Sequence, residues 1–268
     1  MTFDVWWLAY IVLGACTGIL AGMLGVGGGS VMVPILTTLF VAQSVPDASA
    51  VHLALGTSMA SIILTSIMNA RSQHKRQAVD WNVLKLMTPG IVVGTITGSF
   101  VASRVPSMPL AIFFTCVMGY VAFSMVVNTK PKPSRSLPPA GGMMLVGLLI
   151  GGISSLIAIG GGAMTVPFLL WCNVDARRAI GTSAAVGIPI SLAGTIGYAI
   201  NGLHATDVMP PYSLGFVYLP AFILLSVASI LSVPLGVALA WRLPVVVLKR
   251  IFAVVLILLC VKMIQSLM

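Results

Sequence analysis

Ten apolar segments, separated by short polar or proline-containing breaks, occupy almost the whole chain and limit its fold more than any other feature. A bilayer crossing takes roughly 20 residues of apolar helix, so a chain of 268 residues has room for about eight to ten crossings. Only 7% of the residues are charged, whereas a soluble domain carries charge on about a quarter of its positions. The pattern therefore predicts one all-α polytopic membrane domain and excludes an ordinary soluble protein. The segments cover residues 5–24, 30–42, 50–70, 82–103, 108–127, 141–159, 163–172, 178–200, 215–241 and 244–267.

The two halves of the chain repeat each other. Gly18–Leu36 aligns without a gap on Gly151–Leu169, and the two stretches share three consecutive glycines followed by a Val-Pro pair. Further on, Leu55–Ser58 matches Ile180–Ser183. Each half holds five segments, an odd number, so the second half is predicted to be inverted in the membrane relative to the first. The predicted division is a first transmembrane repeat at 1–127, a basic cytoplasmic linker at 128–139 and a second transmembrane repeat at 140–268.

The basic residues predict how the chain is oriented. The sequence has 14 Lys and Arg against five acidic residues, all of them Asp, and its net charge is +9. Cytoplasmic loops of membrane proteins carry an excess of Lys and Arg. If every segment reverses direction, twelve basic residues fall on one face and both termini fall on the other, outer face, so the charge reports topology and gives no support for nucleic-acid binding. The twelve are Arg71, Lys75, Arg76, Lys85, Lys130, Lys132, Arg135, Arg177, Arg178, Arg242, Lys249 and Arg250.

Two of the segments, 30–42 and 163–172, are short for a full crossing. At 1.5 Å per residue they span roughly 20 and 15 Å, against a hydrocarbon core of about 30 Å. Each is either a short tilted span or the returning arm of a re-entrant hairpin formed with the preceding segment. The sequence leaves both readings open: eight full spans plus two glycine-broken hairpin arms, or ten spans.

Short, glycine-interrupted segments at matching places in inverted halves indicate a transporter site where the repeats meet. Glycine costs about 1 kcal/mol relative to Ala inside a helix, so the chain is expected to unwind at each triple glycine and to start a new helix after it. The first N–H groups of such a helix lack partners and its dipole end is positive, which suits a small anion. The predicted anion-binding residues are Gly27, Gly28, Gly29, Ser30, Thr57, Ser58, Gly160, Gly161, Gly162, Thr182 and Ser183.

These residue types also have purely structural uses. Glycines in membrane helices often serve only close packing, and Ser or Thr hydroxyls often bond a carbonyl one turn back in their own helix. His52 is the candidate for proton coupling, because it lies five residues before Thr57 and no acidic residue lies in the middle of a segment. With no Glu and no paired Cys, His or Asp, the sequence predicts no catalytic residue, no metal and no cofactor.

A set of motifs follows in order along nearly the whole chain. They are Gly25–Gly29 with Val33-Pro34, Gly56–Ser58, Val79–Trp81, Ile159–Gly162 with Val166-Pro167, Gly181–Ser183, Ser213–Pro220, Pro234–Gly236 and Leu248–Phe252. Together they resemble the TauE/SafE family of sulfite and organosulfonate exporters. The resemblance implies a bacterial plasma-membrane transporter that moves a small sulfur-containing anion, such as sulfite, sulfoacetate or another organosulfonate, outward. The second glycine-rich copy departs from the first, with Ser155 and Ala158 in place of Gly22 and Gly25.

Pattern and resemblance together predict a secondary transporter that works by alternating access, in which one inverted half moves against the other. A passive anion channel is one alternative, since the same helix ends can line a pore, and a transporter of a different small solute is another. An intramembrane enzyme is excluded, because the segments hold no acid, base or metal cluster at membrane depth. The expected partners are a small anion and membrane lipid, and the oligomeric state, a homodimer included, is left open.

Overall fold

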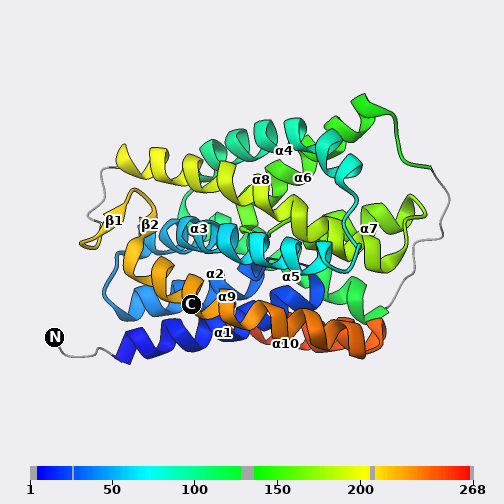
Figure 1. The fold of residues 1–268 in the computed structure, drawn as a ribbon. Helices are drawn as coiled ribbons and strands as arrows, with labels where there is room; N and C mark the ends of the chain where they lie inside the picture. Colours follow the sequence, from blue (N-terminus) through cyan, green and yellow to red (C-terminus); the bar gives the residue numbers. More distant parts are fainter. Residues whose placement is uncertain (1–4, 26, 128–135, 206–208, 266–268) are drawn as a thin grey trace.

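A computed structural model describes residues 5–25, 27–127, 136–205 and 209–265. Within these ranges the chain forms ten α-helices and one small β-hairpin, and most helices lie along one common direction (Figure 1). Seven of the described helices are long and apolar enough to cross a membrane, which confirms the prediction of an all-α polytopic membrane protein. The elements are α1 Val5–Leu24, α2 Gly29–Ala42, α3 Asp47–His74, α4 Trp81–Ala102, α5 Ser107–Val127, α6 Ala140–Ile157, α7 Gly162–Trp171, α8 Ala176–Leu203, β1 Ser213–Leu214, β2 Val217–Tyr218, α9 Leu219–Arg242 and α10 Val245–Gln265.

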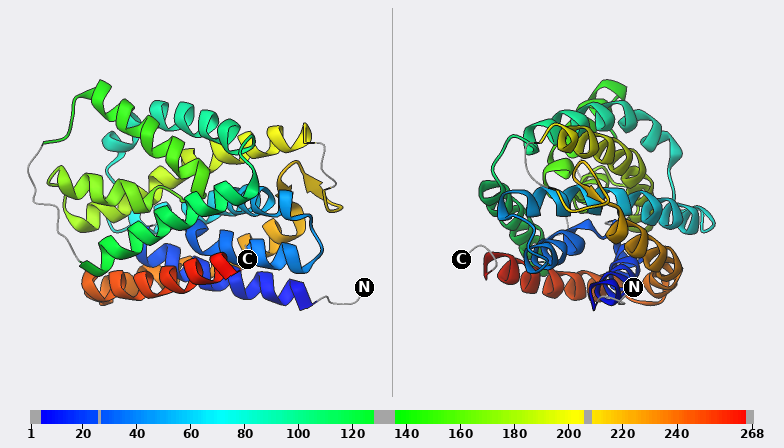
Figure 2. Two further views of the ribbon diagram at one scale, coloured as in Figure 1. Left: turned by 180° about the vertical axis from the view of Figure 1, so that it is seen from behind. Right: turned by 90° about the vertical axis from the view of Figure 1, so that its left-hand side faces the viewer.

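Helices α3 and α8 form the centre of the bundle. Each has 28 residues, and 78% of the apolar stretch of α3 and 67% of that of α8 is buried, more than in any other described candidate span. The two helices pack against each other and run in opposite directions, surrounded by the remaining helices (Figures 1 and 2). The core of the molecule is therefore built from equivalent helices of the two halves.

Outer helices of one half of the chain pack on helices of the other half. Helix α1 packs on α9, and α6 packs on α4, and both contacts are more extensive than any described contact within one half. Glycines bring these backbones together: a methyl group on Gly14 would lie 2.6 Å from the Leu225 carbonyl oxygen, and one on Gly151 would lie 2.5 Å from the Ile91 carbonyl oxygen. Small residues allow such close approach of membrane helices. The two halves are therefore interleaved.

The two short helices are the return arms of hairpins. Helix α2 has 14 residues and α7 has 10, so they span roughly 21 and 15 Å. Helix α1 enters from one end of the bundle and α2 leads back toward that end, while α6 and α7 do the same from the opposite end (Figures 1 and 2). Of the two alternatives that the sequence leaves open, the structure thus has the hairpin arms.

The end of the bundle to the right in Figure 1 is where α3 and α9 end and α8 begins, and these helix ends carry basic residues. The guanidinium carbons of Arg76 and Arg177 lie 4.9 and 4.5 Å from the centre of the Trp241 ring. The indole N–H of Trp241 donates a hydrogen bond to Gln73 Oε1 at 3.4 Å. We call this group of four residues the basic end. The predicted linker residues Lys130, Lys132 and Arg135 and the side chain of Lys249 lie outside the described part.

One stretch differs from the apolar run expected at 215–241. Ser213–Leu214 pairs with Val217–Tyr218 as an antiparallel β-hairpin, and α9 begins only at Leu219. Gly215 closes the turn with a φ of +56°, a left-handed conformation that glycine adopts without steric cost. Since the short strands are themselves largely apolar, hydropathy alone does not separate them from the helix that follows.

Candidate functional site

The tips of the two glycine-rich hairpins touch in the middle of the bundle. A methyl group on Gly27 would lie 2.8 Å from the Cα of Gly160 and 3.2 Å from the Cγ2 of Ile62, which lies near the middle of α3. Gly27, Gly28 and Gly161 have φ values of +76°, +78° and +83°. The hairpin tips therefore require glycine for two reasons: their turns are left-handed, and the two tips contact each other closely.

A helix begins at each hairpin tip. Gly28 is the N-cap of α2 and Gly161 is the N-cap of α7, and neither helix has a side chain that caps its first turn. The first amides of a helix have no partner inside the helix, and the dipole adds partial positive charge there. Both helices start one residue earlier than the sequence predicts, and their two positive ends lie in the buried middle of the molecule.

The hydroxyls around the tips fall into two groups, those that are bonded and those that are not. Ser30, in the first turn of α2, is 1% exposed and its Oγ has no hydrogen-bond partner. Ser58 on α3 is also buried and its Oγ is likewise unpartnered. Ser183, the equivalent of Ser58, donates to the Ile180 carbonyl at 2.8 Å in its own helix and lies 3.5 Å from the Gly25 carbonyl oxygen. Only the first copy thus keeps a free hydroxyl at this position.

The two predicted threonines fix the start of a helix in the opposite half. Thr57 Oγ1 accepts a hydrogen bond from the N–H of Tyr218 at 3.0 Å, and Thr182 Oγ1 accepts one from the N–H of Asp80 at 2.9 Å. Tyr218 and Asp80 are the N-caps of α9 and α4. The duplication of Gly-Thr-Ser therefore has a structural cause in addition to any role toward a ligand.

His52 lies away from the hairpin tips. It precedes Ile62 by ten residues on α3, which corresponds to about 15 Å along the helix axis. Its Nε2 lies 3.1 Å from the carbonyl oxygens of both Ala102 and Val105, and its Nδ1 lies 3.2 Å from the carbonyl oxygen of Ala48. His52 therefore joins the start of α3 to the end of α4, at the end of the bundle opposite to the basic end.

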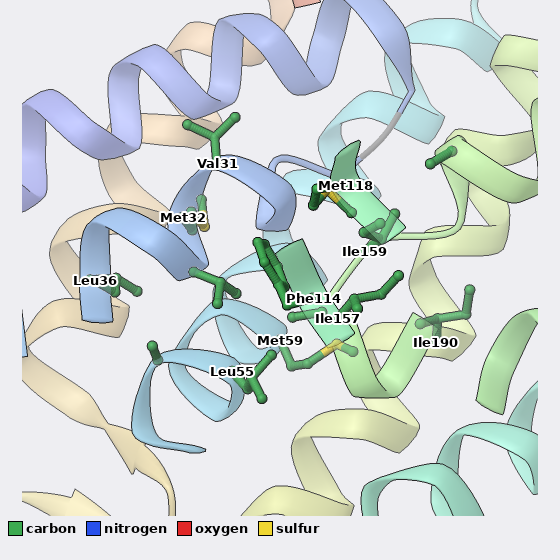
Figure 3. Close-up of a cluster of buried hydrophobic side chains, with 14 of the residues drawn as sticks. Val31, Met32, Leu36, Leu55, Met59, Phe114, Met118, Ile157, Ile159 and Ile190 are labelled. Atoms are coloured by element: carbon green, nitrogen blue, oxygen red, sulfur yellow. The ribbon is translucent and has the colours of Figure 1, made fainter. Parts of the chain in front are cut away.

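A buried apolar cluster lies beside the hairpin tips. Figure 3 shows side chains of α2, α3, α5, α8 and the second hairpin gathered in it. Such a wall excludes water and strengthens electrostatic interactions with any anion held at the helix ends. The labelled members are Val31, Met32, Leu36, Leu55, Met59, Phe114, Met118, Ile157, Ile159 and Ile190.

The described carboxylates are used as helix caps or lie near helix ends. Asp80 accepts from the N–H groups of Asn82 and Val83 at the start of α4, and Asp175 accepts from the N–H of Arg177 at the start of α8. In the ranges that the structure describes, no group of three His, Cys, Asp or Glu residues comes together that could hold a metal ion. Any anion at the hairpin tips would therefore face backbone amides and hydroxyls.

Three buried polar residues near the tips, Ser66, Asn69 and Thr165, are not among the residues that the sequence predicts for the site. They are at most 2% exposed, and each has a side-chain oxygen without a hydrogen-bond partner. Asn69 and Thr165 have no polar counterpart in the other half, and Ser66 has only the isolated Ser191, so no duplicated motif marks these residues. A polar face on an otherwise apolar helix is the signal that could have found Ser66 and Asn69, since residues three and four apart share a face.

Comparison with known proteins identifies the family. A probable membrane transporter protein of Haemophilus influenzae is 35% identical over 258 residues, which cover 96% of this chain and 97% of that protein. A probable membrane transporter protein of Methanocaldococcus jannaschii is 29% identical over 234 residues, covering 85% of this chain and 84% of its own length. Residues 10–263 match the family model described as sulfite exporter TauE/SafE. The chain therefore belongs to the TauE/SafE family and is a membrane transporter, not an enzyme.

Proposed function

We propose that the protein is a secondary transporter that exports a small sulfur-containing anion: sulfite, sulfoacetate or a related organosulfonate. The main support is the meeting of two uncapped helix N-termini, those of α2 and α7, in the buried middle of the bundle. Helix N-termini bind anions through their amides and dipole without a buried cation. The description of the family as sulfite exporters supports the same substrate class.

Alternating access is the proposed mechanism. The contact between Gly27 and Gly160 closes the middle of the bundle, which favours a carrier over an open pore. Since α1 is packed on α9 and α6 on α4, we propose these cross-half pairs as the units that move, with α3 and α8 between them. Movement of one sequence half against the other would have to break both of the glycine-lined contacts.

His52 is proposed to link transport to protons. A neutral imidazole donates one hydrogen bond, whereas an imidazolium donates two, and three carbonyl oxygens surround this ring. The Ser107 hydroxyl lies 3.3 Å from Nδ1, the Phe216 ring lies 5.3 Å away, and Arg104 is in the chain between Ala102 and Val105. Protonation would thus tighten the start of α3 against the end of α4.

The substrate class is tested by thermal unfolding of the purified protein with sulfite, sulfoacetate, sulfate and chloride. Sulfite or a short sulfonate should raise the unfolding temperature, because a ligand that binds only the folded state stabilises it. In proteoliposomes the same anion should show saturable flux and counterflow, with a pH dependence that His52→Gln removes. Transport of a cation or neutral solute with no response to the anions would contradict the proposal, and unsaturable conduction would indicate a channel.

Two glycine variants test whether the anions stabilise the protein by binding at the hairpin tip. Gly161→Val introduces a β-branched side chain at a φ of +83° and 3.0 Å from side-chain atoms of Val186 and Ile190, and should abolish the stabilisation by anions. Gly119→Val is the control, because no atom lies within 4 Å of a methyl group placed there. Equal responses of both variants to sulfite would remove the hairpin tip from the site.

A further inference from the structure

Three polar residues lie on one face of α3, in the stretch that leads from the hairpin tips to the basic end and includes Gln73. Ser66, Asn69 and Gln73 follow Ile62 at intervals of four, three and four residues, which places all of them on the same face of the helix. They are only 2%, 1% and 2% exposed. Since Ile62 contacts the tips, this polar face begins at the candidate site.

Two atoms of this face have no hydrogen-bond partner. Ser66 Oγ is unpartnered, and Asn69 uses Nδ2 to donate to the Ala21 carbonyl at 2.8 Å while its Oδ1 is unpartnered. The carbonyl of Ala21 fixes this orientation, because a flipped amide would place two oxygens against each other. A buried polar group without a partner destabilises the folded protein, so such groups are rare unless they serve a ligand or water.

Both side chains border the hairpins. A methyl group on Gly187 would lie 2.5 Å from Ser66 Oγ and 2.8 Å from the carbonyl oxygen of Gly160, so these two atoms flank the same point. A methyl group on Gly28 would lie 3.6 Å from the Cβ of Ala21, the residue that holds Asn69. Ser66 Oγ therefore lies beside the tip of the second hairpin, and Asn69 is bonded to the residue of α1 that packs against the N-cap of α2.

The equivalent face of α8 offers nothing comparable. Ser66, Asn69 and Gln73 correspond to Ser191, Gly194 and Tyr198. Ser191 donates to the Ile188 carbonyl at 3.1 Å, and the Tyr198 hydroxyl donates to the Ser155 carbonyl at 2.8 Å. The polar face is thus confined to the half of the bundle that leads to the basic end, where Arg76 and Arg177 flank Trp241.

We propose that Ser66 and Asn69 complete the anion site and recognise a ligand that carries a hydrogen-bond donor as well as acceptor oxygens. The Ser66 hydroxyl donates to an oxygen of the anion, and Asn69 Oδ1 accepts from a hydroxyl or acidic hydrogen of the same ligand. Hydroxylated sulfonates and singly protonated oxyanions such as hydrogen sulfite belong to this class. The assignment rests on the proposed function and adds the chemistry by which the site selects among anions.

The test compares 2-hydroxyethanesulfonate with ethanesulfonate, which lacks only the hydroxyl. In thermal unfolding and in competition for transport, the intact protein should prefer the hydroxylated ligand about fivefold, the value of one ordinary hydrogen bond. Asn69→Leu should remove this preference. Ser66→Ala should lower the affinity for both ligands about tenfold or more, because the Ser66 hydroxyl bonds a charged group. Ser191→Ala, at the equivalent place on α8, should leave both affinities unchanged.

Stability without ligand separates a binding role from a structural one. Removing an unpartnered polar atom should leave the unfolding temperature of Ser66→Ala and Asn69→Leu unchanged or raised. The Ala21 carbonyl keeps a partner in Asn69→Leu, since it also accepts from the Gly25 N–H at 2.8 Å. Variants that are less stable without ligand, or that keep the preference of the intact protein, would overturn the assignment. Absence of any response of the intact protein to both sulfonates would instead count against the proposed function.

Discussion

At the scale of single residues, Thr57 and Thr182 show how one half of the chain holds the other. Each accepts a hydrogen bond from a backbone N–H at the start of a helix that belongs to the opposite half. Valine has almost the same shape but no acceptor. Thr57→Val should therefore lower the free energy of unfolding by about 1–3 kcal/mol, the cost of a backbone donor without a partner.

The control for this prediction is Thr57→Ser, which keeps the hydroxyl and should remain close to the wild type in thermal unfolding. Because the bond is made by the oxygen, the loss in Thr57→Val should appear with and without anion. A Thr57→Val protein as stable as the wild type would show that the Tyr218 N–H finds water instead.

The candidate site was predictable from the sequence only where the two halves share a requirement. The triple glycines recur because both hairpins need left-handed turns and close contact, and the threonines recur because both N-caps need an acceptor. Duplication therefore marks what both halves need, whether for binding or for structure. Asn69 corresponds to Gly194, and Ser191, the counterpart of Ser66, bonds a carbonyl of its own helix, so duplication marks neither Ser66 nor Asn69 as a site residue.

At the scale of secondary structure, apolar length predicted the helices well, since a helix in lipid must be apolar along its whole crossing. The predicted segments at 50–70 and 178–200 became the longer helices α3 and α8, which extend beyond the apolar run at both ends. The β-hairpin at Ser213–Tyr218 was not predicted, because its turn depends on the backbone conformation of Gly215 and not on hydropathy.

The contact between α4 and α6 gives a prediction at this scale. Gly94 lies directly against the carbonyl oxygen of Leu148, so a larger side chain must push the helices apart. Gly94→Leu should destabilise the protein by about 1–3 kcal/mol or more, the usual cost of overpacking. Thermal unfolding should show this loss, while Gly119→Leu on α5 should show none, because nothing lies near that glycine. Equal stability of both variants would mean that the α4–α6 contact is looser than the structure indicates.

At the scale of the whole molecule, the inverted repeat could be read from the sequence but the interleaving could not. Repeats show which helices correspond, whereas packing partners depend on surfaces that equivalent helices share. The glycines of α1 could have matched a neighbour in either half, and the structure pairs α1 with α9. The units that we propose to move during transport are therefore identified by the packing in the structure and not by the sequence repeat.

The orientation in the membrane is the last prediction, and it concerns the whole chain. We propose a bacterial plasma-membrane protein with both termini outside, because the basic end should face the cytoplasm. Ser136 is exposed just before α6, and Tyr212, which is 78% exposed, lies beside the β-hairpin. Figure 1 places the starts of α6 and of β1 at opposite ends of the bundle.

The measurement uses single cysteines at these two positions, in a protein whose own Cys16, Cys116, Cys172 and Cys260 are replaced by Ser. An impermeant maleimide added to intact cells should label Tyr212→Cys and should reach Ser136→Cys only after the membrane is opened. The reverse pattern would invert the orientation and leave the fold untouched, because the same helices would cross in the opposite sense. Labelling of both sites from outside would place them on the same side of the membrane. That result would contradict the membrane crossing predicted between them and the hairpin arrangement that brings α2 and α7 together.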